Sequence, residues 1–211
     1  MIRIVVQQPQ VLPWAGLWFK AVSADVYVIY AGVKFDQGDH QHRVTINGSW
    51  VTLPVAGGQR NALIKDVQLA ENFHQGLDKI AVTIRQTCMV KRFKYGDRLG
   101  QLVSILEGWS SKWMLDLNMA LHGELMDVLG IQQELHLDTK VRPEEKIDKL
   151  DECLLEYTKD RTFMYLAGGG GLDYMGYDSL QTPAETRFQK MRPGFRRIAY
   201  CNQLHEMPTH W

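Results

Sequence analysis

The sequence predicts an α/β fold, in which a single domain holds a mixed, largely parallel sheet flanked by helices and carries an inserted β-hairpin. The first observation is a strand, a helix and a second strand in succession within about 30 residues, which is the order of a right-handed parallel crossover. The second is Asn47-Gly48 between two runs rich in β-branched residues, the strongest short-range signal for a hairpin.

The crossover begins with Ile2–Val6, a β-branched run typical of a buried strand. This run leads into the loop Gln7-Gln8-Pro9. Pro13 suits the first turn of a helix because its missing N–H would be unpaired there, and we expect the helix over Trp14–Ala24. Val26–Tyr30 predicts the second strand.

The middle of the chain changes from strand to helix. The hairpin strands are expected at Arg43–Ile46 and Trp50–Val55, and an alternating pattern predicts a further strand over Ile64–Leu69. From about Leu77 to Leu129, apolar residues recur at helical spacing. Gly130 is the expected C-cap of the last of these helices.

The last third alternates again. A short strand is expected at Glu134–Leu137, and Pro143 opens a helix that runs to about Lys159. Phe163–Ala167 predicts a strand that leads into four glycines, and Thr186–Gln189 predicts a late strand. Because the chain has no internal repeat and no convincing linker, we expect one domain over residues 1–211.

Composition excludes several classes of protein. The chain has 211 residues, a formal net charge of zero and 45% hydrophobic residues, which excludes disordered and collagen-like chains. Without an apolar run of about 18 residues or a signal-peptide pattern, we expect a cytoplasmic protein with no membrane partner. Three widely spaced cysteines predict neither a disulfide framework nor a zinc cluster. The charge balance argues against a general polyanion-binding surface but leaves room for a local basic patch.

Two loops that follow predicted strands are the expected walls of a site, since ligands of open α/β sheets bind at the carboxyl ends of strands. In the first, Gln8 and Gln10 flank a proline, so their carboxamides are placed either to bind a polar ligand or to tie down their own loop. In the second, the run Gly168, Gly169, Gly170 and Gly171 is either an anion-binding nest or a flexible connector.

Titratable side chains gather before the hairpin. His40 and His42 have a spacing that places both on one face of an extended segment, and Asp36 and Asp39 are close in sequence. A metal site and a proton-transfer pair are both open, but no third metal ligand follows from the spacing. We favour a general base together with an anion-holding Arg43, because proton transfer and anion recognition need such groups together.

Two basic clusters contain interleaved aromatic residues, one near residues 91–95 and one over 187–197. Such clusters suit nucleic-acid phosphates with base stacking, although a solvated charged face is the common alternative. The nucleic-acid-binding candidates are Lys91, Arg92, Lys94, Arg187, Lys190, Arg192, Arg196 and Arg197.

A series of motifs follows one another in order along most of the chain. It begins with Gln8-Pro9-x-x-Leu12-Pro13-Trp14-x-Gly16-x-x-x-Lys20 and Asp25-Val26. It continues through Val33-x-Phe35, Gln41-His42-Arg43, Gly48, Trp50–Val55, Leu115-x-Leu117-Asn118, Leu129-Gly130-Ile131, Tyr165–Gly168, Gly171-x-Asp173-Tyr174 and Phe188-Gln189. This series resembles the WbqC-like family of bacteria and their viruses.

The resemblance implies a transferase. Family members in surface-polysaccharide gene clusters are suspected of attaching an amino acid or acyl group to an amino sugar. Viral relatives resemble amino acid:DNA transferases, which join glycine or a similar amine to an activated 5-(phospho- or pyrophosphomethyl)uracil. The compact length and the extra arginines favour the viral branch, and with it the host cytoplasm. The implied partners are DNA carrying a phosphorylated 5-hydroxymethyluracil and a free amino acid or amine, with no cofactor.

The resemblance also assigns expected roles to residues. Because the phosphorylated methylene is already activated, the protein holds the leaving phosphate, orients the amine and takes its proton. Arg43, Lys20 and the glycine run are the candidates for holding the anion, and His40 or His42 is the candidate base. The remaining substrate-binding candidates are Asp25 and Asp173 for the ammonium, Gln8 and Gln10 for a base edge, Trp14 and Tyr174 for stacking on a flipped base, and Gln41, Asn118 and Gln189 from the matching motifs.

Two other function classes stay open. The first is an amino-acyl or acyl transferase that acts on an amino sugar of a surface polysaccharide such as an O-antigen. The second is a non-catalytic nucleic-acid-binding module that uses the basic clusters. Binding to DNA that weakens steeply with salt would separate the DNA hypotheses from the sugar hypothesis.

Overall fold

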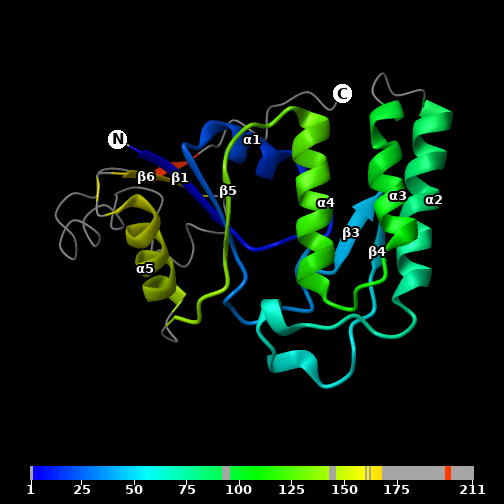
Figure 1. Ribbon diagram of the computed structural model, residues 1–211, viewed down its shortest axis with the longest axis horizontal. Helices are drawn as coiled ribbons and strands as arrows, with labels where there is room; N and C mark the ends of the chain where they lie inside the picture. The colour runs from blue at the N-terminus through cyan, green and yellow to red at the C-terminus, as the bar shows by residue number, and fades with distance from the viewer. Residues whose placement is uncertain are drawn as a thin grey trace. The chain divides into compact units, whose positions relative to one another are not determined.

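The computed structural model describes residues 2–91, 96–142, 146–159, 161, 163–167 and 198–200 (Figure 1). The chain divides into two compact units, and each is described by itself. Unit 1 consists of residues 1–7, 14–29 and 133–211, and unit 2 consists of residues 8–13 and 30–132. The expectation of one domain over residues 1–211 stays a prediction.

Unit 1 is built on a five-stranded sheet whose order is β5-β2-β1-β6-β7. β1 pairs in parallel with β2, where Ile4 lies opposite Val26, and with β6, where Ile2 lies opposite Phe163. β6 pairs in parallel with β7. The strands are β1 (Ile2–Gln7), β2 (Val26–Tyr30), β5 (Leu135–Asp138), β6 (Phe163–Ala167) and β7 (Ile198–Tyr200).

Two helices, α1 (Ala15–Ser23) and α5 (Lys146–Thr158), pack against β1. α1 follows Pro13 as expected and buries Leu17 and Ala21 completely. Because α1 connects two adjacent parallel strands, the predicted strand–helix–strand crossover is confirmed.

Unit 2 contains the predicted hairpin, formed by β3 (Arg43–Ile46) and β4 (Ser49–Thr52). Its turn residues Asn47 and Gly48 have φ of 50° and 76°, which only asparagine and glycine adopt readily. One face of the hairpin is buried in the core of unit 2, with Val44 at 7% and Val51 at 4% exposure. The sheet in unit 1 and this hairpin together confirm the predicted α/β fold class.

Three helices complete unit 2 and lie beside the hairpin (Figure 1). The predicted helical stretch divides into α2 (Phe73–Lys91), α3 (Gly100–Gly108) and α4 (Met114–Leu129). Gly130 ends α4 in the left-handed conformation with φ of 69°, so its predicted role as C-cap is confirmed. Three short 3₁₀ helices, η1 (Gln59–Asn61), η2 (Ile64–Asp66) and η3 (Gly96–Leu99), lie between these elements.

The strand predicted over Ile64–Leu69 is wrong. Residues 64–66 form η2, and the hydrogen bond from the Val67 N–H to the Ile64 carbonyl is a local turn rather than a ladder. The buried positions Ile64 and Val67 are three apart, which is the spacing of a 3₁₀ turn packed on the core. Short apolar runs do not distinguish these two outcomes.

The C-terminal third is described only in part. The strands predicted at Glu134–Leu137 and Phe163–Ala167 are found as β5, one residue later, and as β6. Residues 143–145 and the strand predicted over Thr186–Gln189 lie outside the described residues. The strand β7 was not predicted, because a strand of three residues depends on its pairing with β6 rather than on a local pattern.

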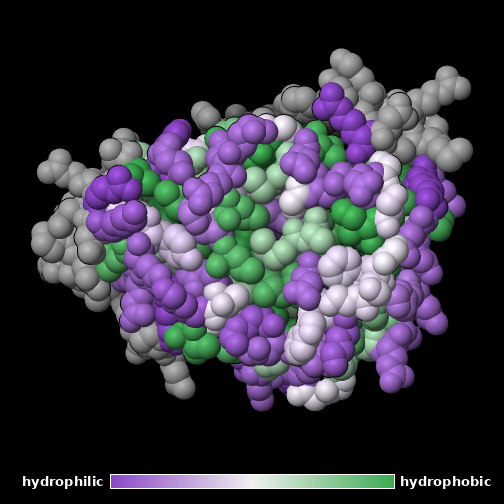
Figure 2. Space-filling view, viewed as in Figure 1, coloured by the Kyte–Doolittle hydropathy of each residue, from purple (hydrophilic) through white to green (hydrophobic). Residues whose placement is uncertain are grey.

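Hydrophilic side chains cover most of the face drawn in Figure 2, and hydrophobic ones reach the surface between them. None of the helices in the described ranges is both long enough and apolar enough to span a membrane.

Candidate functional site

Two neighbouring segments of unit 2 hold most of the described candidate residues. The first is the loop after β1, residues 8–13, and the second is the segment 36–43 that leads into β3. The Val11 N–H donates to the His40 carbonyl over 3.2 Å, and Gln41 Nε2 donates to Gln8 Oε1 over 2.7 Å. These two hydrogen bonds hold together two regions that the sequence indicated separately. The amide side chains that they contain, with Asn118 of α4, are here called the carboxamide cluster: Gln8, Gln10, Gln41 and Asn118.

The orientation of the Gln41 amide is determined by its surroundings. The Asp36 N–H donates to Gln41 Oε1 over 3.1 Å, so the oxygen of this buried amide faces Asp36 and its nitrogen faces Gln8. Gln8 must then present its own oxygen to Gln41, which turns the Gln8 NH₂ group away from that contact.

Asn118 reaches the cluster from α4. It is fully buried, and its Nδ2 donates to the Gln41 carbonyl over 2.8 Å. Since the nitrogen faces a carbonyl, the oxygen points the other way, and among the described residues Asn118 Oδ1 has no hydrogen-bond partner. The same holds for Oε1 of Gln10, a residue that is 6% exposed. A buried polar atom without a partner costs about 1–3 kcal/mol, so each of these two oxygens lowers the stability of the fold unless a donor reaches it.

The two candidate bases differ in their surroundings. His42 is buried, with Nδ1 2.8 Å from the Leu53 carbonyl and Nε2 3.1 Å from the Gln37 carbonyl, so both ring nitrogens face backbone oxygens. His40 is half-buried and packs against Trp50 with ring centroids 5.2 Å apart. Within the described residues, no hydrogen bond occupies a ring nitrogen of His40, in contrast to both ring nitrogens of His42.

Arg43 is the first residue of β3 and, like His40, packs against Trp50. Its guanidinium sits over the Trp50 ring, 4.3 Å from the centroid, and also donates to the Gly38 carbonyl. Its Nε is buried and has no partner among the described residues. A half-buried guanidinium that is held in place and still has a free donor is suited to bind an anion.

Lys20 belongs to unit 1. It lies on α1, is 7% exposed, and donates from Nζ to Gln7 Oε1 over 2.9 Å. In the described part of the chain no carboxylate pairs with it, and burial lowers its pKa from 10.5 to about 8. A buried amine with only a neutral amide as partner can hold an anion that enters.

Asp25 and Trp14, the other described candidates of unit 1, have contacts of their own. The Asp25 carboxylate accepts hydrogen bonds from the N–H and the guanidinium of Arg3, which lower the pKa of Asp25. The Asp25 carboxylate therefore links the residue before β2 to Arg3 of β1, and it already has a charged partner. Trp14 is 54% exposed, and a Cβ on Gly16 would lie 1.9 Å from its ring, so the glycine allows the ring to lie over α1.

Many of the remaining candidates lie outside the described residues: Arg92, Lys94, Gly168, Gly169, Gly170, Gly171, Asp173, Tyr174, Arg187, Gln189, Lys190, Arg192, Arg196 and Arg197. Lys91 is the last residue of α2. Among the described residues, no group of three histidine, cysteine or carboxylate side chains is placed to hold a metal ion.

Two further residues of unit 2 were not predicted as site residues from the sequence. The Trp50 ring packs against both His40 and Arg43, but the sequence indicated Trp50 only as part of a motif. His122 lies one turn after Asn118 on α4 and is 1% exposed, and burial lowers its pKa to about 4. On α4, Asn118 and His122 lie four positions apart on an otherwise apolar helical stripe. This spacing is the sequence signal that could have indicated a buried polar face.

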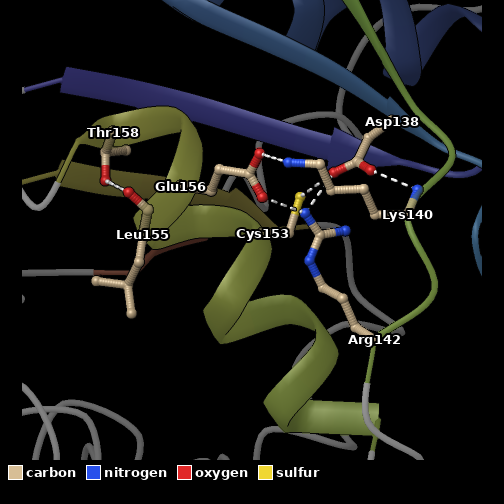
Figure 3. A network of polar contacts seen from close by, with 7 residues as sticks. All are labelled: Asp138, Lys140, Arg142, Cys153, Leu155, Glu156 and Thr158. Carbon is tan, nitrogen blue, oxygen red and sulfur yellow. Dashed lines mark hydrogen bonds and ion pairs between the residues drawn. The ribbon is translucent and has the colours of Figure 1, made fainter.

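A second polar cluster, in unit 1, is charged (Figure 3). The Asp138 carboxylate is fully buried and lies 2.6 Å from the guanidinium of Arg142, which also lies 2.8 Å from Glu156. Lys140 pairs with Glu156 at the solvent-facing side. Cys153 Sγ lies 3.7 Å from Asp138, and burial raises the pKa of this thiol to about 12. This ion-pair network joins β5 to α5.

The family model for the WbqC-like protein family matches residues 8–197, so the chain belongs to that family. The match begins at Gln8 and includes both segments of the carboxamide cluster as well as α4. Comparison with curated proteins and with solved structures finds no match. Family membership is compatible with a transferase of biosynthetic type.

Proposed function

We propose that this protein is a transferase that joins an amino acid or another amine to an activated 5-(phospho- or pyrophospho)methyl-deoxyuridine in phage DNA. The observation that carries the proposal is the juxtaposition, in unit 2, of a histidine without a hydrogen-bonded ring nitrogen, a fixed arginine and a buried carboxamide cluster. Amine transfer to a phosphorylated carbon needs a base, an anion-holding cation and neutral polar groups that orient the amine.

The reaction consists of one displacement. The amine nitrogen uses its lone pair to attack the methylene carbon, so that a C–N bond forms while the C–O bond to the phosphate or pyrophosphate breaks. The leaving group departs with that electron pair, and the extra proton on nitrogen passes to a base. Since the leaving group is already activated, no nucleotide cofactor enters the balance.

The side chains divide these tasks. His40 is the base, because both ring nitrogens of His42 face backbone carbonyls. Arg43 holds the leaving phosphate through its guanidinium, and Lys20 and the glycines of residues 168–171 are further candidates for that task. Gln8, whose NH₂ group is turned away from Gln41, is placed to donate to a base edge. Basic residues of the clusters at 91–94 and 187–197 would bind the DNA backbone.

The test is mass analysis of nucleosides after incubation of the protein with glycine and DNA that carries 5-phosphomethyl-deoxyuridine. A nucleoside with glycine joined through nitrogen supports the proposal. A parallel incubation with a nucleotide-activated amino sugar tests the polysaccharide alternative, and a product in that incubation alone overturns the DNA proposal. DNA binding without product in either incubation leaves the binding-module hypothesis as the answer.

Replacing Arg43 by Ala is expected to lower kcat for transfer by about 100-fold or more, the usual cost of removing a preorganised group that stabilises charge in the transition state. Arg85→Ala is the matched control, because Arg85 pairs with Glu107 on the surface of the same unit. Circular dichroism should find both variants folded. Unchanged turnover in Arg43→Ala would remove Arg43 from the mechanism.

A further inference from the structure

The direction of the Gln8 side-chain amide is set by a chain of hydrogen bonds that begins at a backbone N–H. The Asp36 N–H can only donate, and it donates to Gln41 Oε1 over 3.1 Å. The Gln41 nitrogen therefore faces Gln8, and it donates to Gln8 Oε1 over 2.7 Å. If either amide, or both, were turned over, two donors would oppose each other in this chain.

Gln41 is held in place from two further directions. It is fully buried, and its backbone carbonyl accepts a hydrogen bond from Nδ2 of the buried Asn118 over 2.8 Å. The Asp36 carboxylate accepts the Gly38 N–H over 2.7 Å, which orders the turn that presents the Asp36 N–H. The chain of amides is therefore in place before any ligand binds.

Gln8 is the member of this chain that reaches the surface. It is half-buried, and among the described residues its NH₂ group has no hydrogen-bond partner. This NH₂ group is not among the enclosed polar atoms, in contrast to Gln10 Oε1 and Asn118 Oδ1. Because the Gln8 oxygen is already bonded to Gln41, the part of Gln8 that stays open to a ligand is its donor group.

We propose that Gln41 is a positioning residue that makes Gln8 select a uracil ring over a cytosine ring, an inference that rests on the proposed transferase function. Beside C5, uracil presents the acceptor O4, whereas cytosine presents a donor, its N4 amino group. The Gln8 NH₂ group forms a hydrogen bond with the first and opposes the second. Gln41 does not contact the base and acts only through Gln8.

The role of Gln41 follows from what a lone glutamine would do. A glutamine whose amide can turn presents either its oxygen or its nitrogen, so it fits both bases. The buried Gln41 removes this choice, because its own amide is fixed by the Asp36 N–H. The selectivity thus depends on a side chain that lies one hydrogen bond away from the reading group.

The experiment compares glycine transfer to two single-stranded oligonucleotides, one with a single 5-phosphomethyl-deoxyuridine and one with a single 5-phosphomethyl-deoxycytidine. The measured quantity is the ratio of the two kcat/KM values. The wild type should prefer the deoxyuridine by about tenfold or more. A general loss of structure lowers both rates alike, so it leaves this ratio unchanged.

Gln41→Met keeps the length of the side chain and removes both amide contacts, so the preference should fall to about twofold or less. Gln59→Met is the matched control, because the Gln59 amide makes three hydrogen bonds to the backbone of Ala56 and Gln68. This control should lower stability and keep the wild-type ratio. A wild-type ratio in folded Gln41→Met would overturn the inference.

Gln8→Glu is the second variant, which changes a half-buried residue and leaves Gln41 intact in case Gln41→Met does not fold. One carboxylate oxygen accepts from Gln41, and the other presents an acceptor to the base. The preference should therefore turn to the deoxycytidine. A preference for deoxyuridine that persists in Gln8→Glu also contradicts the proposal.

The same oligonucleotides separate this inference from the proposed reaction. If the wild type transfers glycine to neither, the reaction is rejected, and the ratio is measured as relative binding by fluorescence anisotropy. A binding preference for the deoxyuridine that disappears in Gln41→Met and reverses in Gln8→Glu retains the role of Gln41. Equal binding of the two oligonucleotides by the wild type rejects it as well.

Discussion

The two polar clusters of this protein are built on opposite principles. The cluster in unit 1 consists of charged groups, and Asp138, Lys140, Arg142 and Glu156 each have a partner of opposite charge. The carboxamide cluster in unit 2 consists of neutral groups, and two of its buried oxygens have no partner among the described residues. Charges that compensate one another can stay buried, whereas a buried acceptor without a donor lowers the stability of the fold unless something else binds there.

The difference shows how a structural cluster can be told from a functional one. Perturbed pKa values alone do not separate them, because the thiol of Cys153 and the amine of Lys20 are both strongly shifted by burial. Cys153 lies inside a network whose charges are compensated, while Lys20 has only the Gln7 amide. The state of the partners, rather than the size of the shift, is therefore the useful criterion.

The largest expected effect comes from breaking the buried ion pair of the cluster in unit 1. Arg142→Met leaves the buried Asp138 carboxylate without its guanidinium, and we expect unfolding to become easier by about 3–5 kcal/mol. Urea unfolding at neutral pH measures this. Transfer per folded molecule should be retained, because no residue of this network is among the proposed catalytic or substrate-binding residues. A loss below 1 kcal/mol would show that Asp138 finds another partner or becomes protonated.

A somewhat smaller effect of opposite sign is expected for Lys20→Met. A pKa lowered from 10.5 to about 8 corresponds to about 3 kcal/mol of destabilisation at neutral pH, at about 1.4 kcal/mol per pH unit. Between about pH 8 and 10.5 the unfolded chain binds the additional proton, so the stability of the wild type rises with pH in this window.

Lys20→Met should accordingly be more stable than the wild type at pH 7, by up to about 3 kcal/mol less the loss of the bond to Gln7. The advantage should shrink as pH rises from about 8 and should be smallest near pH 10.5. Urea unfolding at pH 7, 9 and 10.5 follows it. An advantage that does not depend on pH would mean that the lysine is not desolvated in the folded protein.

The smallest effect is expected for the exposed ion pair of the charged cluster, between Lys140 and Glu156. Lys140 and Arg142 both pair with Glu156, but the Lys140 side chain is 63% exposed and the Arg142 side chain is 4% exposed. Lys140→Met should therefore cost less than about 1 kcal/mol, the usual value of an exposed ion pair. Measured beside Arg142→Met, it separates burial from charge. Equal losses in the two variants would contradict this account of the network.

Most of the fold could be predicted because its signals are local. β2 and β6 were predicted with their observed bounds, and Asn47-Gly48 indicated the hairpin turn through the backbone conformations that these residues adopt readily. The prediction over Ile64–Leu69 was wrong because a strand and a 3₁₀ turn place apolar residues inside in similar ways when a segment is short.

The site was predictable only as residue types. The sequence indicated Gln8, Gln10, His42 and Arg43 as polar groups after a strand and before a hairpin, and the resemblance added Asn118. The sequence did not indicate which histidine has ring nitrogens without hydrogen bonds. It also did not indicate that the Trp50 ring packs against both Arg43 and His40, since these features depend on contacts between separate segments.

The sequence by itself determined the fold class, the hairpin, the helical content of unit 2 and the family, because periodicity, turn chemistry and ordered motifs are properties of neighbouring residues. Only the tertiary structure decided that Asn118, 77 residues after Gln41, turns its nitrogen to the Gln41 carbonyl and its oxygen away. Hydrogen-bond satisfaction is a property of the whole set of packed neighbours, and no local pattern encodes which atom of a buried amide is left open.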